Sequence, residues 1–202
     1  PHPLTTPVLF STAIIVAVLL IAHVSLQTYA PAKDTIAFFL GPATVALALP
    51  LYRNRVAFTR ELIPALGGLV AGGLLTMIVA LVSARLFGLD HALQATFAVK
   101  SITAAVAVDV ARIVHGDPSL AAGFVVCTGM IGAAIGPFIL DKAGVRTPIA
   151  RGISLGTISH GQGTAQAASE SELSGAVAGV AMGLGAVLTS LAAPLVVPLI
   201  AR

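Results

Sequence analysis

Five apolar runs dominate this chain of 202 residues, and each is long enough to cross a lipid bilayer as a helix. A hydrocarbon core about 30 Å thick needs roughly 20 helical residues. The runs are residues 8–26, 35–52, 61–86, 119–140 and 173–200. Charged residues make up 9% of the sequence, too few to cover a water-soluble domain of this size. We therefore expect an all-α integral membrane protein with about five transmembrane helices.

The composition also excludes several other classes of protein. Cys127 is the single cysteine, which rules out a disulfide scaffold, and the five histidines are scattered without metal-ligand spacing. A net charge of +3 is typical of basic residues beside a membrane and does not indicate a nucleic-acid surface. The chain has no phosphate-binding loop and no nucleophile elbow. We expect no enzyme activity, no metal site, no cofactor and no nucleic-acid partner.

Two further segments are apolar at their ends but polar or small-residue in their middle. Residues 93–116 contain Lys100-Ser101-Ile102-Thr103, and residues 148–171 contain GTISHGQGT at positions 156–164. Such a middle is costly in lipid unless it is buried in protein or faces a water-filled cavity. Each segment is therefore predicted to be a re-entrant hairpin made of two half-helices.

Two clusters of basic residues predict the orientation of the chain. The clusters are Arg53, Arg55 and Arg60 in one loop, and Lys142, Arg146 and Arg151 in another. The positive-inside rule places both loops, and with them the N-terminus, in the cytoplasm. The first hairpin then enters the membrane from outside and the second from inside. This is an inverted-repeat topology, and it brings both hairpin tips near the midplane of the membrane.

The polar side chains at the two tips are the candidate binding residues. A lysine inside the membrane is rare and usually functional, although it can instead snorkel to an interface or form a structural pair. Hydroxyl, amide and imidazole groups can bind a small polar solute or a proton, whereas a tight glycine turn between packed helices is the alternative. The set is Lys100, Ser101, Thr103, Ser159, His160, Gln162, Gly163 and Thr164.

Two other features lie close to these segments. Gly41-Pro42, followed by Thr44, interrupts the second apolar run and forms either a packing kink or a third wall of the site. Asp109 and Arg112 are three residues apart, so they can share a helix face as a structural or gating pair. Small residues at helical spacing predict close helix packing at three places. They are Gly67, Gly68, Gly72 and Gly73, then Gly132 with Gly136, and Gly175 with Gly179 and Gly183.

Four separated motifs make the sequence resemble the LrgB/CidB family. They are FLGPATVALALPLY at 39–52, KSIT at 100–103, TGMIGAAIGP at 128–137, and PIARG, LGTISH and GTA within 148–165. The motifs occur in order over nearly the whole chain. The chain departs from the family pattern at Ala104-Ala105-Val106, where many relatives have a Thr-Pro step, and at Gly161-Gln162, where Ala-Ile is common. Both departures lie at the predicted site and therefore bear on substrate preference.

The resemblance implies two different functions. Bacterial members of the family are called antiholin-like proteins or regulators of murein hydrolase export, and they pair with a small LrgA/CidA-type membrane protein. Other relatives transport glycolate, glycerate or pyruvate. The broken helices favour transport of a small monocarboxylate, and the holin-like role with that partner is the alternative.

The transporter hypothesis predicts an elevator-like arrangement in a bacterial inner membrane, with a proton or sodium as the coupling ion. Residues 1–92 would form a scaffold at a homodimer interface. Residues 93–202 would form the transport unit. Its parts are the hairpin 93–116, the helix 119–140, the hairpin 148–171 and the helix 173–201.

Overall fold

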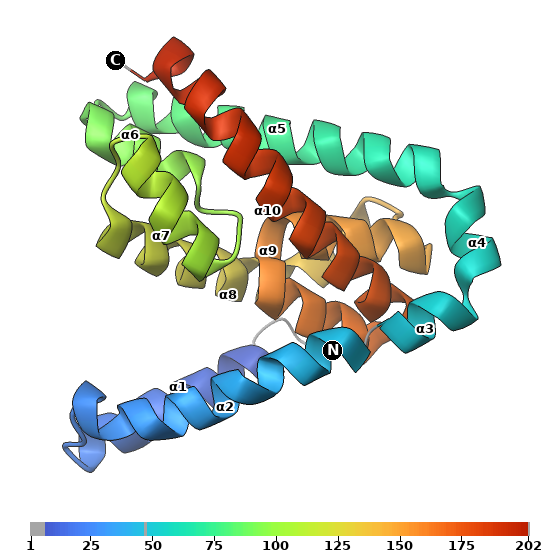
Figure 1. The fold of residues 1–202 in the computed structure, drawn as a ribbon, viewed down its shortest axis with the longest axis horizontal. Coiled ribbons are helices and arrows are strands. Elements are labelled where there is room, and N and C mark those ends of the chain that lie inside the picture. Colours follow the sequence, from blue (N-terminus) through green and yellow to red (C-terminus); the bar gives the residue numbers. More distant parts are fainter. Residues whose placement is uncertain (1–6, 47, 202) are drawn as a thin grey trace.

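The computed structural model describes residues 7–46 and 48–201, which form helices joined by short loops and contain no strand (Figure 1). The helices are α1 (Pro7–Ile21), α2 (Leu26–Ala46), α3 (Ala48–Arg53), α4 (Arg55–Arg60), α5 (Leu62–Leu86), α6 (His91–Ala98), α7 (Ala104–Ile113), α8 (Pro118–Lys142), α9 (Pro148–Glu170) and α10 (Glu172–Ile200). Among the described residues, α5, α8 and α10 are long and apolar enough to cross a membrane. The prediction of an all-α membrane protein is confirmed.

The N-terminal helices differ in detail from the predicted spans. Helix α1 has 15 residues and is shorter than the predicted run 8–26. Within the predicted span 35–52, α2 continues through Gly41 and Pro42 to Ala46, and α3 covers Ala48–Arg53. A proline inside a helix removes one N–H donor but keeps a helical φ, so the helix can continue past it. Pro42 is exposed, and the side chains at positions 41 and 44 of the predicted third wall lie outside the described residues.

Helices α6 and α7, with the non-helical residues 99–103 between them, form the first predicted hairpin, which we name hairpin 1. Thr96, which lies near the end of α6 and has a fully buried side chain, links hairpin 1 to α8. The Thr96 hydroxyl donates to the carbonyl of Ala92 at 2.6 Å and accepts from the N–H of Asp117 at 2.8 Å. Asp117 in turn caps the first turn of α8. The bond from Asp117 joins α6 to the start of α8.

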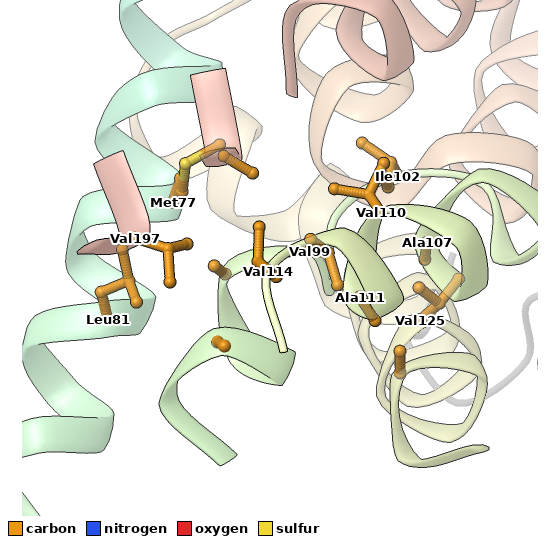
Figure 2. Close-up of a cluster of buried hydrophobic side chains, with 14 of the residues drawn as sticks. Met77, Leu81, Val99, Ile102, Ala107, Val110, Ala111, Val114, Val125 and Val197 are labelled. Atoms are coloured by element: carbon orange, nitrogen blue, oxygen red, sulfur yellow. The ribbon is translucent and has the colours of Figure 1, made fainter. Parts of the chain in front are cut away.

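A cluster of apolar side chains packs hairpin 1 into the body of the protein (Figure 2). Val99 and Ile102 come from the break, and Val110 and Val114 come from α7. Their partners are Met77 and Leu81 of α5, Val125 of α8 and Val197 of α10. Hairpin 1 is thus held between two of the long helices on one side and α8 on the other.

The second predicted hairpin, which we name hairpin 2, is α9. The chain reverses at His160, which has φ 40° and ψ −123° inside the segment Pro148–Glu170. Arg151 and Glu170 form an ion pair at 2.6 Å. In a straight helix these residues would lie about 28 Å apart, so the two arms must run antiparallel. The prediction of a hairpin in this segment is confirmed.

The two hairpins open at opposite ends of the helix bundle. The base of hairpin 2 faces the α4–α5 junction, where Arg60, Glu61, Thr147 and Pro148 line one cavity of about 490 Å³. At the other end of α5, Arg85 Nη1 donates to the carbonyl of Ile200 at 3.3 Å, close to the start of α6. The predicted inverted arrangement is therefore present, and the two basic clusters lie at the same end.

Candidate functional site

The tip of hairpin 1 combines an ammonium group with a helix start that no side chain caps. Lys100 lies in the break and is half-buried, and its Nζ donates to Ser101 Oγ at 3.1 Å. Lys100 forms no ion pair with any residue that the structure describes. Thr103 occupies the N-cap position of α7, but its hydroxyl makes no capping bond. An unpaired cation beside a helix N-terminus favours an anion at this tip.

Lys100 also lies at the wall of a cavity of about 480 Å³ between α5 and hairpin 1. The other lining residues come from α5, from the α5–α6 loop and from Phe97 of α6. None of the predicted binding residues of hairpin 2 lines this cavity. The predicted residues of hairpin 2 therefore lie outside this cavity, although Lys100 is near enough to His160 for the two side chains to interact electrostatically.

The tip of hairpin 2 docks against α8. His160 is buried, and its Nε2–H donates to the backbone carbonyl of Val125 at 2.9 Å. Gly129 lies one turn further along α8, where a Cβ atom would stand 2.5 Å from His160 Cε1 and would collide with Gln162 Oε1. Glycine at position 129 is thus required for the imidazole ring to reach the Val125 carbonyl.

Two more glycines extend this contact along α8. A Cβ at Gly132 would collide with Ser159 Oγ, and one at Gly136 would lie 2.8 Å from Leu155 Cδ2. The spacing of Gly129, Gly132 and Gly136 by three and four residues puts them on one helix face. The predicted small-residue packing at Gly132 and Gly136 is confirmed, and its partner is the first arm of hairpin 2.

The second arm of hairpin 2 packs tightly on the first. Thr164 Oγ1 donates to the carbonyl of His160 at 2.9 Å, and a Cβ at Gly163 would collide with the carbonyl of Leu155. Ser159, His160, Gly163 and Thr164 are all buried, whereas Gln162 is half-buried. In this conformation the tip of hairpin 2 is closed against protein.

Both tips contact the same turn of α8. The rings of Phe97, near the tip of hairpin 1, and Phe124 of α8 are 4.3 Å apart between centroids. The next residue, Val125, binds His160 through its carbonyl and packs against hairpin 1 through its side chain. A movement of either tip would therefore displace this turn of α8 and, through it, the contacts of the other tip.

Asp109 and Arg112 form the predicted pair on α7, with a distance of 2.9 Å between Oδ1 and Nη1. Both side chains are exposed. Whether this exposed pair is structural or gates transport stays a prediction. Within the part of the chain that the structure describes, no group of three or more His, Cys, Asp or Glu residues could hold a metal ion.

Arg151 was predicted as one of a basic cluster, but the structure gives it a more specific role. It is 13% exposed and bonds to Glu170, to Asp141 Oδ1 at 2.6 Å and to the carbonyl of Val145 at 3.0 Å. The hydrogen bonds to Glu170, opposed by burial and reinforced by Asp141, raise the pKa of Arg151 above its ordinary value. Arg151 therefore stays charged and ties both arms of hairpin 2 to α8.

Sequence reasoning missed the contribution of α5 to the surroundings of Lys100. Thr76 and Ser83 both line the Lys100 cavity and are seven residues apart, which places them on one face of the helix. Their spacing inside an otherwise apolar run was the available signal. The cavity itself depends on how α5 packs against hairpin 1, and no local pattern reports that.

Comparison with known proteins gives one family and several relatives. The model of the LrgB-like family matches residues 1–199. A protein of Bacillus subtilis (strain 168) called Uncharacterized protein YxaC is 41% identical over 197 residues, covering 98% of this chain and 86% of the relative. The Holin-like protein CidB of Staphylococcus epidermidis is 32% identical over 196 residues, with 97% and 86% covered. The CidB of Staphylococcus aureus is 31% identical over 197 residues, with 98% and 86% covered. No solved structure matches the chain.

Proposed function

The chain belongs to the LrgB-like family of membrane proteins, and on that premise we propose that it transports small monocarboxylates of the glycolate, glycerate, pyruvate and lactate class. The transport cycle would be an elevator-like alternation of access between the two sides of the membrane. Its substrates would be anions at neutral pH, so the protein must supply positive charge inside the membrane.

The observation that supports this proposal most strongly is the situation of Lys100. Its ammonium group lies in the break of hairpin 1, has no carboxylate partner among the described residues and borders a cavity. A half-buried cation inside the membrane without a counter-ion is unfavourable, and such a residue usually has a function. A substrate carboxylate would supply the missing negative charge.

The other predicted site residues would complete the binding of the carboxylate. Ser101 and Thr103 would donate hydrogen bonds beside Lys100. The tip of hairpin 2, with Ser159, His160, Gln162, Gly163 and Thr164, would form the opposing wall after it leaves α8. The Gln162 side chain would form a hydrogen bond with the 2-oxo or 2-hydroxy oxygen of the substrate. If a proton and not sodium drives transport, His160 would carry that proton.

The opposed hairpins support an elevator-like mechanism. Each hairpin is followed by a long helix, hairpin 1 by α8 and hairpin 2 by α10, as in transporters built from inverted repeats. We propose that residues 93–202 move against residues 1–92, which would hold two copies of the chain together. The membrane would be a bacterial inner membrane with the two basic clusters on the cytoplasmic side.

Uptake of labelled pyruvate and glycolate into proteoliposomes tests the proposal. The wild type is compared with Lys100→Met and with Lys142→Met, a matched control at the exposed end of α8. We expect saturable uptake by the wild type and by Lys142→Met, and none by Lys100→Met. Unchanged uptake by Lys100→Met would remove the electrostatic basis of the proposal.

A second function is favoured by the names of the relatives, which call CidB a holin-like protein. In that case the chain would assemble with a small LrgA/CidA-type membrane protein and regulate murein hydrolase activity and lysis. Absence of uptake by the wild-type chain alone, followed by dye leakage only after such a partner is added to the vesicles, would favour this function over transport.

A further inference from the structure

The cavity beside Lys100 is larger than the site of a very small acid needs to be. It extends along α5 from Leu75 to Phe87 and has a volume of about 480 Å³. At about 30 Å³ per molecule, that is room for about sixteen waters. A three-carbon acid on Lys100 would leave most of this space to water or lipid.

The walls of the cavity are apolar over most of their length. Val79 and Leu75 of α5, Leu89 of the following loop and the rings of Phe87 and Phe97 line it. Lys100 is the single charged residue among the lining residues. A cavity of this kind binds a molecule with one anionic group and a sizeable apolar body.

Two hydroxyl groups interrupt the apolar wall. Thr76 and Ser83 are both half-buried and line the cavity from α5. Neither hydroxyl makes a hydrogen bond to another described residue, although other helical hydroxyls here, such as those of Ser154 and Ser190, bond to the carbonyl four residues earlier. Two turns of helix separate them, or about 10 Å. They are available to polar atoms along the length of a bound molecule.

We propose that the preferred substrates are 2-oxo or 2-hydroxy monocarboxylates with a branched aliphatic or aromatic side chain. This inference rests on the proposed function and sharpens its substrate class. The carboxylate binds Lys100, and the side chain lies between α5 and hairpin 1, against Val79 and Phe97. Because the oxygen atoms of such an acid all lie at one end, only the hydroxyl nearer to Lys100, that of Thr76 or of Ser83, donates a hydrogen bond to the bound acid.

Competition for labelled pyruvate uptake in proteoliposomes tests this inference. The competitors are 2-oxobutanoate, 4-methyl-2-oxopentanoate and phenylpyruvate, with glycerate as a small polar acid. Burial of each additional methylene group should lower the inhibition constant by about fourfold. We expect 4-methyl-2-oxopentanoate and phenylpyruvate to inhibit at least tenfold more strongly than unlabelled pyruvate, and glycerate to inhibit least. Equal potency across the series, as expected if lipid chains fill the cavity, would overturn the inference.

Two variants of α5 separate a role of the cavity from a general effect on the helix. Both side chains are exposed, but Val79 lines the cavity and Val82 does not, so Val79→Phe fills the cavity and Val82→Phe adds the same ring outside it. Val79→Phe should abolish the preference for large acids, and Val82→Phe should keep that preference. Equal behaviour of the two variants would also overturn the inference. Saturable uptake of pyruvate without preference leaves the proposed function standing, while no uptake of any acid removes both.

Discussion

Arg151 and Glu170 are joined by two parallel hydrogen bonds, from Nε to Oε2 at 2.6 Å and from Nη2 to Oε1 at 3.0 Å, although they are 19 positions apart in the sequence. The pair closes the base of hairpin 2. Because Arg151 also bonds to Asp141, it fastens the hairpin to the end of α8. The tip of the same hairpin is fastened to α8 through His160 and Val125. Hairpin 2 and α8 are therefore joined at both ends, as expected of parts that move together.

Glu170→Gln should lower the stability of the folded protein. It leaves the guanidinium of Arg151, which is 13% exposed, without its main partner, and such a loss costs about 2–3 kcal/mol. The midpoint of thermal unfolding in detergent measures the effect. Glu172→Gln is the control, since Glu172 is exposed in the first turn of α10 and should matter by less than about 1 kcal/mol. Equal midpoints for the two variants would contradict the role of the pair.

The raised pKa of Arg151 also gives a prediction for pH. A group whose pKa is raised on folding contributes stability at pH values below its unfolded pKa and loses it only as the pH rises through the folded pKa. The unfolded pKa of arginine is already above the working range. The difference in midpoint between wild type and Glu170→Gln should therefore stay constant from about pH 7 to about pH 10. A difference that disappears within this range would show that another group controls the contact.

Gly132→Ala should disturb hairpin 2 without removing any polar group. The new Cβ would collide with Ser159 Oγ and crowd Ser159 Cβ at 3.0 Å, so the Ser159 hydroxyl must rotate and the hairpin must give way by a few tenths of an ångström. Gly123→Ala is the matched control on the same helix, because a Cβ at Gly123 meets nothing within 4 Å. Alanine is the better helix former by about 1 kcal/mol, so the control should be neutral or stabilising. We expect Gly132→Ala to unfold at a lower temperature and to take up substrate more slowly. Equal unfolding midpoints and uptake rates for the two variants would contradict this docking.

The hairpins could be predicted from the sequence because their signal is local. A lysine with two hydroxyl residues, or a run of glycine, serine and histidine, cannot lie in lipid as an ordinary helix. The partner of His160 could not be predicted, since a backbone carbonyl such as that of Val125 has no sequence signature. The predicted interruption of the second apolar run at Gly41-Pro42 was wrong, because these residues do not end the helix. Proline removes a hydrogen-bond donor but permits a helical backbone, and α2 continues through it.

Thr96→Val should loosen the link between hairpin 1 and the start of α8. Valine keeps the shape of threonine but leaves the partly buried N–H of Asp117 without its 2.8 Å partner. An unsatisfied group of this kind costs about 1–3 kcal/mol. Thr59→Val is the control, because the Thr59 hydroxyl is exposed and bonds only to the nearby carbonyl of Val56. Thermal unfolding should separate the two variants, and an unaffected Thr96→Val protein would mean that apolar packing alone holds the hairpin.

Lys100→Met should make the protein more stable while it loses transport. The wild type holds an ammonium group without a counter-ion, and an apolar side chain of similar length removes that desolvation penalty. The thermal midpoint should rise in the variant. Pyruvate should raise the midpoint of the wild type, because a ligand of the folded state stabilises it, and should leave the variant unchanged. A variant that is less stable than wild type would indicate a structural partner for Lys100.

Cysteine labelling tests whether the two tips form one site during transport. The native Cys127 is exposed, so the experiment begins from Cys127→Ala. Cysteine is then placed at Thr103, at Gln162 and, as a control, at Ser119, which is exposed at the start of α8. If the tips enclose the substrate, pyruvate should slow the reaction of a water-soluble thiol reagent at 103 and at 162 but not at 119. Because Gln162 packs at Gly129 when hairpin 2 is closed, labelling at 162 should also be slower than at 103 without substrate. If pyruvate slows labelling at position 103 but not at 162, the substrate binds hairpin 1 alone, and hairpin 2 only closes the opposite side of the transport pathway.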